Sequence, residues 1–99
     1  MDDIDDALER IIARAGERFD SHDIIRWFAH ANQRRYVELL HETNGEKPFQ
    51  TLHASLGKRI RAICEQQGFT GVESESLDVF FNPSSHCMAW SRASDSFSR

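Results

Sequence analysis

The chain has 99 residues, 39% of them hydrophobic, which is enough for one domain with a single modest core. Its two cysteines, Cys64 and Cys87, exclude a disulfide framework, and we expect both to be reduced. The acidic start is unlike a signal peptide, and no apolar run is long enough to cross a bilayer, so we expect a cytoplasmic protein without membrane contact.

The net charge of -4 is distributed unevenly along the sequence. Residues 1–9 carry -5, residues 10–61 carry +4 and residues 62–99 carry -3. A basic middle between acidic ends permits an anionic partner, and it is equally typical of ordinary solvated helix surfaces.

The first half of the chain predicts helices from the spacing of its apolar residues. A first helix over residues 2–15 has one apolar stripe and is ended by Gly16. A second helix opens at Asp20 or Ser21, either of which can cap it. A third runs from Gln33 to about Glu42, and the pattern leaves open whether these last two are one bent helix.

The best-defined element is a fourth helix from about Pro48 to Gln67, followed by Gly68. Across the four helices, apolar periodicity predicts a common buried core. The residues expected in it are Leu8, Ile12, Ile25, Phe28, Tyr36, Leu40, Phe49, Leu52, Leu56, Ile60 and Ile63.

After Gly68 the helical periodicity is lost. Residues 69–71 are interpreted as a turn, residues 77–81 as a β-prone segment and residues 82–85 as a second turn. Residues 86–90 fit either a returning strand or a short helix. We therefore predict one helical domain over residues 1–90 and a mobile Ser-rich tail over residues 91–99.

No constellation in the sequence indicates catalysis. The five histidines are scattered over the predicted elements, Cys64 has no His or Cys nearby in sequence, and the side chains of adjacent His86 and Cys87 diverge, so we expect no metal site. No glycine-rich phosphate loop and no nucleophile signature are present. We expect a protein that is not an enzyme and has no cofactor.

The outer face of the fourth helix is the candidate contact surface. It combines small polar side chains with basic ones, which suits close approach to a groove and contact with phosphates. The candidate binding residues are Thr51, Ala54, Ser55, Lys58, Arg59 and Arg61 on this helix, with Arg34 and Arg35 on the third. Glu65 on the same face and the sequence pI of about 5.7 argue against nucleic acid.

Two resemblances accompany these residues. The segment from Gly45 to Gly57, with helices before it and a β-prone end after it, resembles the third-helix region of winged helix-turn-helix domains, as found in some restriction enzymes and chromatin proteins. The stretch from Phe19 to Trp90, through Tyr36, Phe49-Gln50-x-Leu52-His53 and Asn82, resembles small uncharacterised bacterial and phage proteins.

The winged-helix resemblance implies a mainly α, four-helix domain with a short C-terminal β-hairpin or irregular segment. It implies that the fourth helix is a recognition helix and that residues 77–90 form a wing. The acidic residues Asp78, in that wing, and Glu75, just before it, stand where a DNA-binding wing usually offers Lys or Arg.

The leading hypothesis is therefore a non-catalytic module that binds a protein on or within a nucleic-acid-handling complex. One alternative is a regulator that binds DNA directly through residues 48–67. The other is a small acidic inhibitor of a host protein, encoded by a phage or mobile element, that binds through its acidic N-terminus or exposed aromatic side chains.

Overall fold

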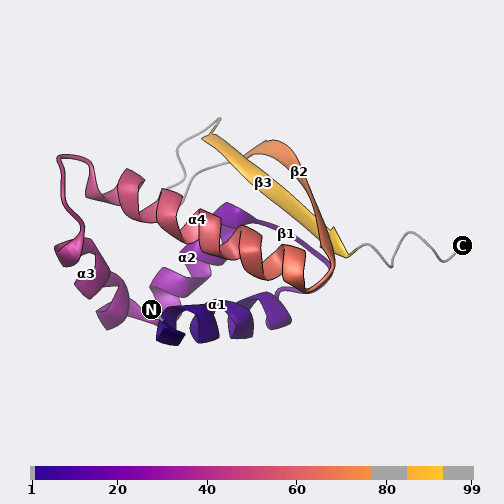
Figure 1. Ribbon diagram of the computed structural model, residues 1–99, viewed down its shortest axis with the longest axis horizontal. Helices are drawn as coiled ribbons and strands as arrows, with labels where there is room; N and C mark the ends of the chain where they lie inside the picture. Colours follow the sequence, from indigo (N-terminus) through magenta and orange to yellow (C-terminus); the bar gives the residue numbers. More distant parts are fainter. Residues whose placement is uncertain (1, 77–84, 93–99) are drawn as a thin grey trace, which may run out of the picture.

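The computed structural model describes residues 2–76 and 85–92. It confirms a mainly helical fold with a small antiparallel sheet (Figure 1). In chain order the elements are α1 (Asp2–Arg14), β1 (Arg18–Asp20), α2 (Ser21–Ala31), α3 (Gln33–Glu42), α4 (Pro48–Gln66), β2 (Phe69–Ser76) and β3 (Ser85–Arg92). No helix in the described part of the chain has the length and apolar character needed to cross a membrane.

The helix boundaries follow the capping chemistry of the sequence. Asp20 starts α2 with a capping box: its side chain accepts from the backbone N–H of Asp23, and the Asp23 side chain accepts from the backbone N–H of Asp20. Pro48 occupies the first turn of α4, where a missing N–H costs nothing. Gly16 and Gly68 have positive φ angles of 89° and 87°, which terminate the preceding helices.

Residues 21–42 form two helices, which settles the alternative that the periodicity left open. Asn32 separates them with φ -130° and ψ 55°, outside the helical region. Its backbone N–H still donates to the carbonyl of Phe28, so α2 is closed before α3 begins.

The sheet has the strand order β1-β3-β2, with both pairs antiparallel. The prediction of a turn at residues 69–71 is wrong, because Phe69 pairs with Arg92 and opens β2. The segment 86–90 is a strand, and β3 continues to Arg92, past the predicted start of the tail at residue 91. The β-prone segment 77–81 and the Asn82-Pro83 turn lie outside the described residues.

The core includes residues of all four helices and of the sheet, and α4 packs against β2 while α2 packs against β3. Its largest fully buried side chain is Trp90, whose Nε1 donates to Ser21 Oγ at 3.2 Å. Nine of the eleven predicted core residues are buried, and Leu40 is half-buried against the core. The prediction that Phe49 is buried is wrong, because the residue is 44% exposed. Periodicity shows the direction in which a side chain points around the helix, but it does not show how far the neighbouring elements extend along it.

Candidate functional site

The outer face of α4 is exposed to solvent as its helical periodicity predicts. Its exposed members are Thr51, Ala54, Ser55, Lys58 and Arg61. The opposite face buries Leu52, Leu56, Ile60, Ile63 and Cys64. The geometry therefore leaves a strip of short side chains along α4 with cations towards its C-terminal half.

The cations around this strip are largely held by carboxylates of the same chain. Arg61 pairs with Glu65 one turn later at 3.1 Å. Arg59 is only partly exposed and reaches across to Asp5 of α1, with Nε 2.8 Å from Oδ1. Both pairs reduce the positive field that α4 presents to a polyanion.

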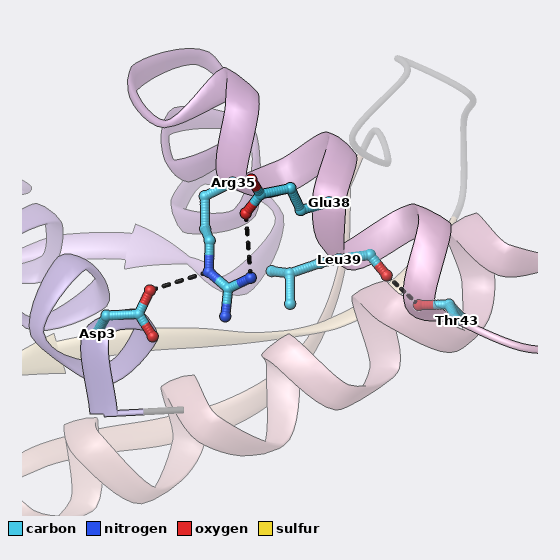
Figure 2. A network of polar contacts seen from close by, with 5 residues as sticks. All are labelled: Asp3, Arg35, Glu38, Leu39 and Thr43. Carbon is cyan, nitrogen blue, oxygen red and sulfur yellow. Dashed lines mark hydrogen bonds and ion pairs between the residues drawn. The ribbon is translucent and has the colours of Figure 1, made fainter.

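Arg35 of α3 is engaged in the same way, as Figure 2 shows. Its guanidinium donates to Asp3 of α1 at 2.9 Å and to Glu38 of its own helix at 3.4 Å. The hydrogen bond from Arg35 holds the pKa of the Asp3 carboxyl below its usual value, and the same bond raises the pKa of Arg35. The acidic first turn of α1 thus faces the predicted basic residues.

Lys58 and Arg34 are the two predicted cations without an ion pair in the described part of the chain. Arg34 lines a shallow surface made only of α3 residues, including Val37 and His41, with the acids Glu38 and Glu42 beside it. Most of the predicted cations therefore lie beside acidic side chains of the same chain.

His53, next to the candidate residue Ala54 in sequence, is half-buried at the inner edge of α4. Its Nε2 is 2.7 Å from the hydroxyl of Tyr36, and the two rings stack with centroids 5.9 Å apart. Burial raises the pKa of the Tyr36 hydroxyl. These contacts join α3 to α4, so His53 has a packing role.

A surface that the sequence did not single out lies between α1 and α2. We call it the α1–α2 groove; it has an apolar floor and a basic rim. Its lining residues are Ala7, Arg10, Ile11, Arg14, Ala15, Trp27, Ala31 and Asn32, and the part beneath Trp27 has a volume of about 220 Å³.

Trp27 and two arginines give this groove its character. The Trp27 side chain is 42% exposed, although the same helix buries Ile24, Ile25 and Phe28. Arg10 and Arg14 form no ion pair among the described residues. The only sequence signal was the position of Trp27 at the edge of the apolar face of α2.

Comparison of the chain with protein-family models, with curated proteins and with solved structures finds no match.

Proposed function

We propose that the chain is a non-catalytic protein-binding module that docks its partner in the α1–α2 groove. The observation that carries this proposal is the half-exposed Trp27 over an apolar floor, with two arginines on the rim that form no ion pair with any residue the structure describes. Trp and Arg are the side chains most enriched among residues that dominate binding energy at protein interfaces.

The chemistry of the groove defines the partner. An apolar side chain inserted beneath Trp27 would contact Ile11 and Ala15, and Asp or Glu side chains beside it would reach Arg10 and Arg14. The occupant is therefore a segment that carries apolar and acidic residues together. The acids of α1 are poorer contact points for a basic partner, because Asp3 and Asp5 already hold Arg35 and Arg59.

The test is selection of peptides from a random phage-displayed library on the immobilised domain, followed by calorimetry with the enriched peptides. We expect these peptides to combine apolar residues with Asp or Glu. Trp27→Ala should weaken their binding by roughly 30-fold, the loss of a 2 kcal/mol anchor. Arg14→Glu should also weaken peptide binding, and the loss of affinity should be larger at low salt than at high salt.

Phe49→Ala is the matched control, because Phe49 is an aromatic residue of similar exposure on a different surface. Its peptide affinity should equal that of the unaltered domain. If Trp27→Ala leaves the affinity of the selected peptides unchanged, the partner binds elsewhere and the α1–α2 groove is not the docking site.

Direct DNA binding through α4 is the second candidate, and the order of the elements favours it. The winged-helix resemblance implies a recognition helix followed by a β-hairpin, and here α4 is followed by the β2–β3 pair. Lys58, exposed and without an ion pair in the described residues, is the cation best placed to reach a phosphate.

Fluorescence anisotropy with mixed duplex and single-stranded DNA at low salt tests this candidate, because low salt exaggerates weak electrostatic binding. Each lost phosphate contact should lower the slope of log affinity against log salt by about one. Lys58→Ala should show that change. Absence of binding at tens of micromolar, or binding unchanged by Lys58→Ala with Arg61→Ala, would exclude α4 as a DNA-reading helix.

A further inference from the structure

Three side chains of metal-ligand type meet where β1, α2 and β3 join. They are Asp20, His22 and Cys87, and one ligand atom from each lies within 4.8 Å of the other two. His22 is buried, with 9% of its surface exposed, and the other two are half-buried. The cluster is separate from both the α1–α2 groove and the outer face of α4.

The strand register explains why residues so distant in sequence come together. β1 ends with Asp20 paired to Ala89, and α2 begins at the next residue, so Asp20 and His22 come beside β3, on which Cys87 lies two residues before Ala89. Side chains two apart on a strand share one face, so Cys87 lies on the same face of the sheet as Ala89.

The junction that holds the cluster is tied together by Ser21. Its hydroxyl donates to the carbonyl of Met88 at 3.4 Å and accepts from Trp90 Nε1 at 3.2 Å. The first turn of α2 is thereby fixed against β3 at Met88 and at Trp90, and the capping box fixes the Asp20 carboxylate. The three donors are therefore carried by a rigid part of the fold, as a metal site requires.

We propose that Asp20, His22 and Cys87 bind one zinc ion, with water as the fourth ligand. Thiolate, imidazole and carboxylate are the three protein donors that zinc accepts, and the thiolate selects against magnesium and calcium. Tetrahedral zinc bonds of about 2.0–2.3 Å place ligand atoms roughly 3.5 Å apart. The three ligand atoms lie within 4.8 Å of one another, so side-chain shifts of about 1 Å would bring them to that separation.

Sequence reasoning argued against such a site because the histidines and cysteines show no short ligand spacing and the side chains of His86 and Cys87 diverge. The fold uses a different histidine from the one adjacent to Cys87. No spacing rule could find this set, because the three residues meet through a strand pairing between opposite ends of the chain.

The first measurement is titration of the metal-free domain with Co²⁺, a spectroscopic stand-in for zinc. One equivalent should produce the near-ultraviolet thiolate-to-cobalt charge-transfer band and the visible bands of tetrahedral cobalt, and Zn²⁺ should abolish both. In parallel, Zn²⁺ should protect Cys87 of the unaltered domain from a thiol reagent. Cys64 is silent in that assay because it is fully buried.

The variants separate a ligand from a structural residue. Cys87→Ser should abolish the charge-transfer band. Asp20→Asn keeps an N-cap, since Asn and Asp cap equally well, but should weaken Co²⁺ binding by at least about tenfold. His30→Gln, an exposed histidine of the same helix, and Cys64→Ala are matched controls that should leave the spectrum unchanged.

Two results would overturn the proposal. One is a titration without a charge-transfer band together with no protection of Cys87, both of which use the unaltered domain and need no variant to fold. The other is a band that persists in Cys87→Ser and disappears in Cys64→Ala, which would assign the thiolate to Cys64.

Discussion

Individual residues of α4 differ sharply in their contribution to stability, although one apolar stripe contains them all. Leu56 is buried to 1% exposure and Phe49 is 44% exposed. Leu56→Ala should lower the free energy of unfolding by about 2–5 kcal/mol through lost burial and a cavity. Phe49→Ala should cost less than about 1 kcal/mol, because water already reaches its ring.

Urea denaturation of the two variants measures this difference. A midpoint shift for Phe49→Ala as large as that for Leu56→Ala would mean that the first turn of α4 is covered in solution.

Cys64 makes stability depend on pH at the alkaline end. Burial, assisted by the nearby charge of Glu65, raises the pKa of the Cys64 thiol from 9.0 to about 12. The folded state therefore retains a proton that the unfolded state loses, and this contribution to stability is complete below pH 9.0. The free energy of unfolding should fall as pH rises from 9.0 towards 12, by at most about 1.4 kcal/mol per pH unit.

Urea midpoints on either side of pH 9.0 test this linkage in the unaltered domain and in Cys64→Ala. In Cys64→Ala the free energy of unfolding should fall less steeply with pH. Some dependence on pH should remain because of Tyr36, whose pKa is also raised by burial. Equal slopes in the two proteins would show that the thiolate is tolerated in the core.

At the scale of elements, replacing two glycines by alanine should have opposite effects on stability. A Cβ at Gly71 of β2 would lie 2.5 Å from Cζ3 of Trp90, which is buried and cannot withdraw. Gly71→Ala should therefore destabilise the fold by about 1–3 kcal/mol through overpacking. Gly57, within α4, has nothing within 4 Å of that position. Gly57→Ala should stabilise the fold by about 0.5–1 kcal/mol, since alanine is the better helix former.

Thermal unfolding followed by circular dichroism compares the two variants directly. A neutral Gly71→Ala would mean that β2 lies further from the Trp90 ring than in this structure.

The helix bounds were predictable from sequence to within a residue or two, because each helix has a period of 3.6 and α1, α2 and α4 also have a clear cap or stop. The break between α2 and α3 was left open, because Asn32 forms no side-chain cap that would mark it. The strands were not predictable. β1 has three residues and exists only through its pairing with β3, while the Gly71 that marks β2 as a turn is there to admit the Trp90 ring. The same limit applies to the site: exposure of the α4 strip follows from periodicity, whereas Arg59–Asp5 and Arg35–Asp3 depend on tertiary packing.

At the scale of the whole molecule, the acidic first turn of α1 connects three helices. Asp3 contacts α3 through Arg35, and Asp5 contacts α4 through Arg59. Simultaneous replacement of Asp2, Asp3, Asp5 and Asp6 by Asn should nevertheless leave a cooperative fold. The core that holds α1, through Ile4, Leu8 and Ile12, is untouched by these changes.

The strength of the α1–α4 connection is measured by a double-mutant cycle of Asp5→Asn with Arg59→Gln. Its coupling energy should be below about 1 kcal/mol, because partly exposed ion pairs contribute little, and it should shrink with added salt. If the variant with all four N-terminal Asp residues replaced by Asn is unfolded at room temperature, then electrostatics, and not apolar packing, holds α1 in place.

The position of β3 in the middle of the sheet also has a kinetic consequence. β3 is the last described strand in the sequence, yet β1 and β2 each pair only with it within the described residues. As the chain leaves the ribosome, α1, α2 and α4 can assemble from local contacts, while β1 has no partner until the strand about seventy residues downstream has been made. Pairings of such long range close slowly. During synthesis the nascent domain should therefore pass through a helical stage in which the site of Trp90 is open, and a chaperone would recognise that stage by its uncovered apolar face.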